Sequence, residues 1–556
     1  MNNLEIYKKY KRFEIPKKKV SFKDICFPKF SDFQIPQKFM GKYFSPHNKD
    51  LDQNGILIYH KAGSGKTLLA ISICLNNLEF GIKPICVMPA SLVNNFYKDL
   101  LSPVLNNRYI SKSEKLKLDS YEIGGKDYRK LMDELISRID KDFTILSIHK
   151  FVELLSLNKL KLDNKLLIID EVQNVVSEGG NFYKIIYNSI QSSKNLKIVL
   201  MSATPIFDRP VEIALTLNLL KLKNEFPTGV DFNSTFIKLK QSPNGKISYK
   251  LKNINKFLNL SHGLVSYFKG APDYTFPEAI IKYVKCEMSP FQISSYNDVL
   301  KNDKMATRSL QESILSLPGN FLLGPRLISN IAFPNKKKGD EGLSSLKGNA
   351  LSENLYKYSS KFAAILPKLK KHCKTFIYSN FKESGGIKSL VKILEANGYK
   401  DYMKHGPGKN RFCTITSDLD LRKREEVRNV ANNIKNLKGD YLKIILGSPS
   451  LREGISFFGF QQAILIDPNW NISRDIQIIA RVVRYCSHKN VPEEERFVKV
   501  YILLATLPNK TSIDEYIVSL QQMKYKINKK FENLLQLNAF DCRLFKNAND
   551  LKGECY

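Results

Sequence analysis

The sequence lacks the usual features of secreted and membrane-spanning proteins. Its nine cysteines form no CxxC pair and their number is odd, so neither a disulfide framework nor a zinc module is expected. The first twenty residues are basic but contain no apolar core of a secretory signal. No segment approaches the roughly 18 uncharged apolar residues that a membrane span requires. These absences favour a reducing compartment and predict a cytoplasmic protein with no membrane partner.

Acidic residues are also few relative to basic ones. The 556 residues include 87 Lys and Arg against 54 Asp and Glu, which gives a net charge of +33. Such an excess predicts a polyanionic partner, and nucleic acid is the commonest polyanion. The many Lys, Asn and Ile residues leave a second interpretation open, in which the charge is a solvated lysine-rich surface. The length alone predicts two or three domains.

Short apolar runs alternate with helical patterns in two separate parts of the chain. This alternation is typical of a parallel sheet covered by helices, so the predicted fold class is α/β. The region between the two parts is rich in lysine and mostly helical in pattern, and residues 333–354 are expected to form a mobile loop. The predicted division is an N-terminal arm (1–45), a first α/β lobe (46–220), a basic helical insertion (221–355), a second α/β lobe (356–510) and a helical tail (511–556).

The segment HKAGSGKT, residues 60–67, lies between the predicted strand GILIY and the predicted helix LLAISICL. Glycines in this setting allow backbone N–H groups to surround phosphate oxygens, and the following helix adds its positive dipole end. Lysine then reaches the β- and γ-phosphates and threonine offers a hydroxyl to Mg²⁺. The segment departs from the strict motif because His60 occupies the place of the first glycine. The predicted cofactors are ATP and Mg²⁺, and the candidate residues are Gly63, Ser64, Gly65, Lys66 and Thr67.

A pair of carboxylates follows another predicted strand, in LLIIDEVQN. Asp170 lies at the carboxyl end of four apolar residues, where open α/β sheets bind ligands, and is assigned to Mg²⁺. Glu171 is placed to act as the general base that polarises the attacking water. Ser202 and Thr204, in LMSATP, follow a further strand and are expected to hydrogen-bond to the carboxylate segment.

The segment SRDIQIIARVVRYCSH, residues 473–488, contains two arginines on an otherwise apolar pattern. Spacings of four and three residues place Gln477, Arg481 and Arg484 on one side of a predicted helix. One interpretation is an exposed helix face with solvated arginines. The other is a pair of arginines that serve a phosphate site, which the upstream phosphate loop favours.

These motifs occur in the order found in superfamily 2 helicases and translocases, which the chain resembles from about residue 35 to 540. The resemblance implies two RecA-like lobes with ATP between them, and Arg481 and Arg484 as fingers that reach the γ-phosphate. It also implies an adenine-reading role for Gln37, with Gln34 as the alternative, and a coupling role for Gly454. Two positions depart from the family: Gln173 replaces a common histidine, and Ala480 a common glycine.

A narrower resemblance rests on GLVSYFKG, LREGISFFGFQQAILIDPNWNISR and RVVRYCSHKNVPEEERFVKVYIL. These strings look like the viral group that contains nucleoside triphosphate phosphohydrolase I and the early transcription factor small subunit of poxviruses. Relatives occur in other large cytoplasmic DNA viruses and on cytoplasmic linear plasmids of yeast. The resemblance implies a DNA-dependent ATPase that serves early transcription at initiation or termination, with a viral-type RNA polymerase or transcription factor as partner, in the host cytoplasm or packaged in virions.

In proteins of this kind, loops that follow strands contact nucleic-acid phosphates, so little base specificity is expected. The candidate residues are Ser91, Ser147, Lys382 and Ser450. Two alternatives remain open: an RNA or replicative helicase that unwinds duplexes, and a transcription-complex subunit without catalysis. ATP turnover measured with and without DNA separates the non-catalytic subunit from the two kinds of ATPase.

Overall fold

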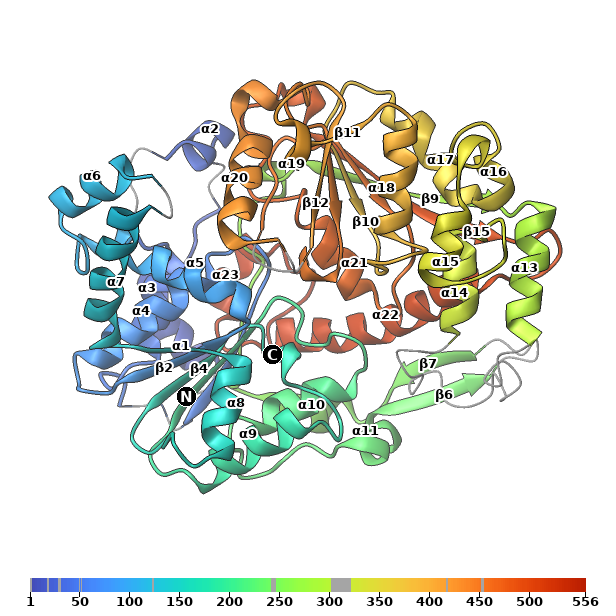
Figure 1. Ribbon diagram of the computed structural model, residues 1–556. Helices are drawn as coiled ribbons and strands as arrows, with labels where there is room; N and C mark the ends of the chain where they lie inside the picture. The colour runs from blue at the N-terminus through green and yellow to red at the C-terminus, as the bar shows by residue number, and fades with distance from the viewer. Residues whose placement is uncertain are drawn as a thin grey trace. The chain divides into compact units, whose positions relative to one another are not determined.

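The computed structural model of the protein describes residues 3–17, 20–28, 32–49, 51, 53–122, 125–241, 247–301, 322–416, 419–451 and 455–556. They form two compact units, each built on its own sheet (Figure 1). The first unit comprises Met1–Pro272 and Lys526–Tyr556, and the second comprises Asp273–Tyr525. The first unit is therefore discontinuous, because its last residues follow the whole of the second unit in the sequence.

The first unit is built on a six-stranded sheet with the order β3-β2-β4-β5-β1-β8, in which all neighbours are parallel. Every residue of β1, β2, β4 and β8 is buried, as the apolar runs of a sheet covered on both faces require. The strands are β1 (Gly55–His60), β2 (Pro84–Met88), β3 (Thr144–Ser147), β4 (Leu166–Ile169), β5 (Lys197–Ser202) and β8 (Val265–Phe268).

Helices cover both faces of this sheet, and each face has its own hydrophobic cluster. One face packs against α8 (Ile148–Ser156), α9 (Asn181–Ser192), α10 (Val211–Asn218), α11 (Gly229–Phe236), α12 (Ile254–Ser261) and the end of α22 (Ile513–Leu537). The other packs against α1 (Asn3–Tyr10), α3 (Ile35–Tyr43), α4 (Lys66–Leu78), α5 (Ala90–Leu100), α7 (Lys126–Asp140) and α23 (Cys542–Asn549). Two further helices, α2 (Phe22–Cys26) and α6 (Lys112–Ser120), belong to the same unit.

The second unit repeats this plan on a seven-stranded parallel sheet with the order β11-β12-β13-β10-β14-β15-β9. The two parallel α/β sheets confirm the predicted fold class, that of two RecA-like lobes. The strands are β9 (Glu278–Glu287), β10 (Thr375–Tyr378), β11 (Lys400–Asp401), β12 (Arg411–Ile415), β13 (Ile444–Gly447), β14 (Gln462–Leu465) and β15 (Phe497–Thr506).

Three groups of helices pack against this second sheet. One face carries α19 (Tyr402–His405), α20 (Leu421–Asn432) and α21 (Ile472–Ile479). The other carries α15 (Gly339–Ser345), α16 (Leu355–Tyr358), α17 (Ser360–Leu369) and α18 (Ile387–Ala396). A smaller cluster joins α13 (Pro290–Lys301), α14 (Leu323–Asn330) and the beginning of α22. Within the described ranges, no helix has the length and apolar character needed to cross a bilayer.

The residues expected to form a separate insertion are divided between the two units instead. Strand β8 completes the edge of the first sheet beside β1, and β9 completes the edge of the second sheet beside β15. An antiparallel pair of strands, β6 (Ile237–Gln241) and β7 (Ile247–Leu251), also lies in this region. The expected tail is divided in the same way, because α22 begins in the second unit and ends in the first.

The expectation of a mobile loop at residues 333–354 is wrong. The segment contains α15 and a short 3₁₀ helix (Gly348–Leu351), and it buries Phe333, Leu343 and Leu346 against the second sheet. Its Lys, Gly and Ser content suggested a loop, but these few apolar side chains are enough to fix it, because burying each of them contributes about 1.5–3 kcal/mol.

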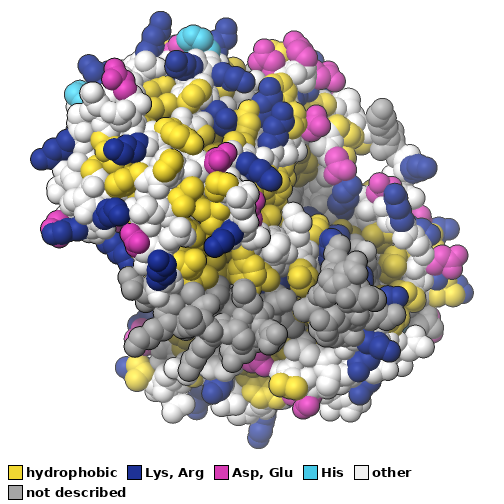
Figure 2. Space-filling view, turned by 90° about the vertical axis from the view of Figure 1, so that its right-hand side faces the viewer, with side chains coloured by type: hydrophobic (Ala, Val, Ile, Leu, Met, Phe, Trp, Pro, Cys, Tyr) yellow, Lys and Arg dark blue, Asp and Glu magenta, His cyan; other side chains and the backbone are white. Residues whose placement is uncertain are grey.

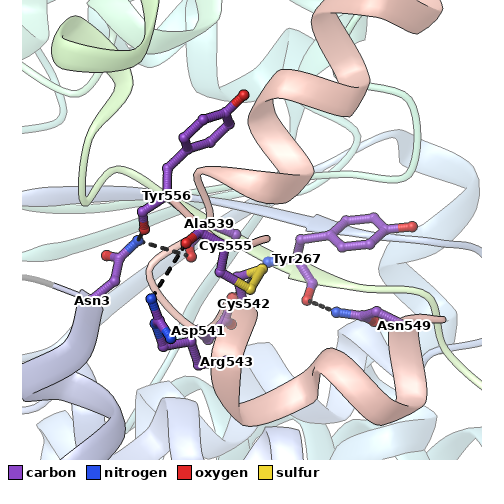
Figure 3. Close-up of a disulfide and its surroundings, with 9 residues drawn as sticks. All are labelled: Asn3, Tyr267, Ala539, Asp541, Cys542, Arg543, Asn549, Cys555 and Tyr556. Atoms are coloured by element: carbon purple, nitrogen blue, oxygen red, sulfur yellow. Dashed lines mark hydrogen bonds between the residues drawn. A yellow bond between two sulfur atoms is a disulfide. The ribbon is translucent and has the colours of Figure 1, made fainter. Parts of the chain in front are cut away.

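Contrary to the expectation from the sequence, Cys542 and Cys555 form a disulfide (Figure 3). Both residues are buried, and the bond closes a loop that contains α23. The expectation failed because it relied on short spacing, whereas these cysteines are 13 positions apart and meet only after the chain has turned back past α23. Asn3 of α1 donates a hydrogen bond to the Tyr556 carbonyl at 2.8 Å, so the end of the chain is anchored a second time.

We predict that replacing Cys555 with Ser lowers the free energy of unfolding of the first unit by about 3 kcal/mol, because a closed loop of this length restricts the unfolded chain. Urea unfolding of oxidised protein, followed by circular dichroism, measures the change. Cys373→Ser is the matched control, because Cys373 is a free cysteine of the second unit. Equal unfolding midpoints for Cys555→Ser and the wild type would contradict the prediction.

Candidate nucleotide-binding and hydrolysis site

The phosphate loop follows β1 and leads directly into α4, as predicted. Gly63 and Gly65 have φ angles of 81° and 77°, the left-handed region that favours glycine. Lys66 is the first residue of α4, and its Nζ donates to the His60 carbonyl at 3.3 Å. The Ser64 hydroxyl is buried and has no hydrogen-bond partner among the described residues. A buried donor of this kind, beside a helix N-terminus, fits a phosphate oxygen.

Thr67, the predicted magnesium ligand, has an acidic neighbour that the sequence did not reveal. It lies near Asp99 of α5. Burial raises the pKa of Asp99 to about 6, and the nearby Thr67 hydroxyl opposes that rise. A single acidic residue in an amphipathic helix is common, so the sequence carried no signal for this contact.

Gln37 reaches the phosphate loop from α3. Its Nε2 donates to the Gly65 carbonyl at 3.2 Å, and its Oε1 accepts from the Gln34 N–H at 2.7 Å. The Gln37 carbonyl accepts from the Ser72 hydroxyl of α4 at 2.9 Å, which holds the two helices together. Of the two glutamines considered from the sequence, the structure brings Gln37 to the loop and makes Gln34 the residue that caps α3. The role of Gln37 in reading adenine remains a prediction.

The carboxylate pair follows β4, at the edge of the sheet where the phosphate loop lies. Asp170 is buried, its N–H donates to the Val87 carbonyl at 2.8 Å, and its Oδ1 accepts from the Glu171 N–H at 2.9 Å. Glu171 has a φ angle of 50°, in the left-handed region that a non-glycine residue seldom adopts. Such backbone strain concentrates at functional sites, since the surrounding structure must enforce it.

A hydrogen-bonded chain joins the carboxylates to the residues after β5. Gln173 donates from Nε2 to Glu171 Oε2 at 2.5 Å and accepts at Oε1 from the Ser202 hydroxyl at 2.7 Å. The Thr204 N–H donates to Ser202 Oγ at 2.9 Å. The contact expected between this segment and the carboxylates is therefore present, and Gln173 makes it. Because β5 lies between β1 and β4, its last residue, Ser202, lies between the strands that lead to the phosphate loop and to Asp170.

The described residues contain no group of three or more His, Cys, Asp or Glu side chains that could hold a metal ion by themselves. Mg²⁺ is commonly held by one or two carboxylates, water and the phosphates of the substrate. Asp170, which follows β4, and the Thr67 hydroxyl, in the first turn of α4 after β1, are the protein groups that suit this mode. The donor set therefore fits magnesium bound together with a nucleotide and does not form a closed metal cage.

In the second unit, the predicted arginine helix ends earlier than expected. Helix α21 stops at Ile479, so Arg481 and Arg484 lie in the turns that follow it and the prediction of one continuous helix face is wrong. The Arg481 carbonyl accepts from the Phe457 N–H at 2.8 Å and is thus unavailable to a further helical turn. The Arg481 N–H donates to the Ile478 carbonyl, a tight contact typical of a helix end.

Arg481 is held within its own unit. The residue is 8% exposed, and its side chain donates to the carbonyls of Gln477 at 3.1 Å and Ile455 at 3.2 Å. Arg484 is half-buried, and its backbone N–H donates to the Ser487 hydroxyl at 3.3 Å. Gly454, expected in the coupling segment, lies outside the described residues.

The four candidates for nucleic-acid contact all lie where a strand ends. Ser91 is exposed in the first turn of α5 after β2, and Ser147 ends β3 and caps α8 by accepting from the Lys150 N–H. Lys382 follows β10 and lies 3.8 Å from the Glu383 carboxylate. Ser450 is in a 3₁₀ turn (Pro449–Leu451) after β13. Their placement suits the predicted contacts, which remain predictions.

Two family models match the chain, and together they define its class. The model for DEAD/DEAH box helicases matches residues 48–213, and the model for the helicase conserved C-terminal domain matches residues 358–486. The first match contains the phosphate loop and the carboxylate pair, and the second contains Arg481 and Arg484. This arrangement is that of a superfamily 2 helicase, an enzyme class that binds and hydrolyses ATP.

Within this class the chain belongs to a family of viral helicases. It is 42% identical over 553 residues to a protein of Acanthamoeba polyphaga mimivirus with the provisional name ATP-dependent RNA helicase R563, covering 99% of this chain and 96% of that protein. It is 26% identical to R350 of the same virus, provisionally named in the same way, over all of this chain and 79% of that protein. It is 25% identical to an African swine fever virus protein named Termination factor NPH-I homolog, over 97% of this chain and 83% of that protein.

We predict that Gln173→Ala lowers kcat by about tenfold. Glu171 loses the hydrogen bond from Gln173, worth about 1.4 kcal/mol, and with it the link through Gln173 to Ser202. The KM for ATP should change little, since Gln173 does not contact the phosphate loop. Steady-state ATP hydrolysis provides both constants. Gln173→His, which introduces the side chain common in the family, is the matched variant and should retain most of the activity. Full activity in Gln173→Ala would show that the chain of hydrogen bonds has no part in turnover.

Proposed function

We propose that the protein is a DNA-stimulated ATPase that translocates along DNA within a viral-type early transcription machinery, at initiation or termination. One observation supports the ATPase part above the others. The segments that follow β1 and β4, parallel strands separated only by β5, meet at one edge of the sheet and contain Ser64, Lys66, Asp170, Glu171 and Gln173. The transcription part is supported by the similarity to a protein named as a termination factor.

In the proposed reaction, the loop N–H groups, the Ser64 hydroxyl and the Lys66 ammonium hold the β- and γ-phosphates of ATP. Asp170 and Thr67 would hold Mg²⁺, which neutralises charge on the phosphates. Glu171 accepts a proton from the attacking water, and its hydrogen bond from Gln173 fixes the direction in which its carboxylate points. Arg481 and Arg484 of the second unit stabilise the charge that develops on the γ-phosphate.

The proposed polymer is DNA, held by its phosphates through Ser91, Ser147, Lys382 and Ser450. Contacts of this type carry no base sequence, so promoter choice would come from a partner polymerase or transcription factor. On the face drawn in Figure 2, the Lys and Arg side chains of the described residues lie scattered between hydrophobic and acidic side chains. The proposed location is the host cytoplasm or the virion.

The second candidate function is that of an RNA helicase, which the names of R563 and R350 favour. RNA and DNA differ at the 2′-hydroxyl, so an enzyme that contacts phosphates alone would accept both. A preference for RNA would require contacts to ribose. Adding single-stranded and double-stranded DNA and RNA of equal length to an ATPase assay separates the two functions, and a strand-displacement assay shows whether a duplex is unwound.

We predict that double-stranded DNA raises ATP turnover in the wild type and that Lys66→Ala lowers kcat/KM for ATP on the order of 10²–10³-fold, since one donor to the phosphates is lost. Binding of DNA in the absence of nucleotide should be unchanged. Measurement of phosphate release, together with fluorescence anisotropy of labelled DNA, tests both statements. Normal hydrolysis by Lys66→Ala would refute the assignment of the site.

We also predict that Arg484→Ala lowers kcat on the order of 10³-fold, the magnitude typical of an arginine that stabilises a phosphoryl transition state. The KM for ATP should change less than kcat, because the contact forms with the transition state. Lys404→Ala, which removes an exposed basic residue of the same unit, is the matched control. Equal turnover by Arg484→Ala and Lys404→Ala would exclude a finger role for Arg484.

A further inference from the structure

The last two residues of β1 lead directly into the phosphate loop, and their side chains point to opposite faces of the sheet. Tyr59 belongs to the hydrophobic face that packs against α22, whereas His60 lies on the face that packs against α23. Both side chains are fully buried. Each one ends in a polar group that needs a partner in the interior, since an unpaired buried polar group costs about 1–3 kcal/mol.

On the first face, the Tyr59 hydroxyl is surrounded by polar partners. It donates to Glu532 Oε2 of α22 at 2.9 Å, and it accepts from Lys61 Nζ at 2.7 Å and from Gln536 Nε2 at 3.2 Å. Lys61, the first residue of the loop segment after β1, also lies 3.8 Å from the Glu532 carboxylate. Tyr59 and Lys61, the residues on either side of His60, are therefore both held by one carboxylate of α22.

On the second face, another carboxylate holds His60 through a serine. His60 Nε2 lies 2.9 Å from the Ser266 hydroxyl of β8, and that hydroxyl donates to Asp541 Oδ2 at 2.5 Å. Burial, with the nearby Lys66, lowers the pKa of His60 to about 3, so the ring is neutral. With Ser266 donating to Asp541, the serine oxygen is left to accept from His60 Nε2–H. The imidazole, which stands where the motif has glycine, thus has a fixed orientation.

Asp541 is itself held in place by a backbone hydrogen bond and by the disulfide at the next residue. Its Oδ1 accepts from the Tyr267 N–H at 3.0 Å, and the Cys542–Cys555 disulfide begins at the next residue. At the other end of α23, Asn549 donates to the Tyr267 carbonyl at 3.0 Å (Figure 3). It also accepts from the Lys269 N–H at 2.7 Å. Residues 541–549 therefore form hydrogen bonds with the carboxyl end of β8, the strand next to β1.

We propose that Glu532 and Asp541 are positioning residues that fix the phosphate loop from the two faces of the sheet, the first through Tyr59 and Lys61 and the second through Ser266 and His60. Neither carboxylate touches the nucleotide. They restrict the backbone at residues 59–61, from which the N–H groups of the loop take their direction. Pre-organised donors of this kind hold phosphates without reorganising on binding. This inference rests on the proposed ATP site.

The test uses the full-length protein and the variants Glu532→Gln, Tyr59→Phe and the double variant. Each single change should lower kcat/KM for ATP about tenfold, mainly through KM, with unchanged binding of DNA in the absence of nucleotide. If Glu532 acts through Tyr59, the double variant should be no worse than the more affected single variant. Tyr59→Phe keeps the ring in contact with Tyr267, so the strand retains its packing.

Asp541→Asn tests the second face in the same assay, and a similar fall in kcat/KM is expected. If this variant does not fold, His60→Gly, which restores the motif residue and removes the need for Ser266, replaces it and should also raise the KM. Glu554→Gln is the matched control, an exposed carboxylate of the same terminal segment, and should match the wild type.

Values of kcat/KM within twofold of Glu554→Gln in the Glu532, Tyr59 and second-face variants would overturn the proposal. If the falls in kcat/KM of the two single variants multiply in the double variant, the part of the proposal in which Glu532 acts through Tyr59 is overturned. If the wild type hydrolyses ATP and Lys66→Ala does not, the proposed ATP site stands in either case. Absence of hydrolysis in the wild type would instead reject the proposed function.

Discussion

Parallel pairing of β4, β5 and β1 is the constraint on which the candidate site depends. Because the three strands run in one direction, their carboxyl ends meet at one edge and bring together residues that are more than a hundred positions apart in the sequence. The phosphate loop, the Asp170–Glu171 pair and the Ser202 segment are thereby neighbours. Gln173 completes the arrangement, since its amide spans the distance between two of these ends with one donor and one acceptor.

The sequence was sufficient for those parts of the site that consist of a strand and the residues directly after it. Buried parallel strands leave unbroken apolar runs, so β1, β4 and β5 and the polar residues after them could be predicted with their order in the chain. The glutamine at position 173 was visible as a departure from the family. That its two ends join Glu171 to Ser202 could not be predicted, because side-chain contacts between strands depend on the strand order, which the sequence did not reveal.

Other features were missed because they depend on distant contacts. The early end of α21 follows from the Phe457 N–H taking the Arg481 carbonyl, and the residue spacing alone favoured a longer helix. The Cys542–Cys555 disulfide depends on α23 turning the chain back, and the cysteine count indicated the opposite. Tyr59, Glu532 and Asp541 carry no motif, and only their burial beside the phosphate loop distinguishes them from ordinary core and helix residues.

The discontinuity of the first unit has a consequence for synthesis on the ribosome. Its sheet can form once β8 has emerged, but Glu532 and Asp541, the carboxylates that accept from Tyr59 and Ser266, are then still untranslated, behind the entire second unit. Chains elongate at about 5–20 residues per second, so the nascent first half would wait for many seconds without these two acceptors. Docking of the terminal helices is thus the closing step of folding, and a chain cut short by a premature stop codon would leave an incomplete nucleotide-binding half.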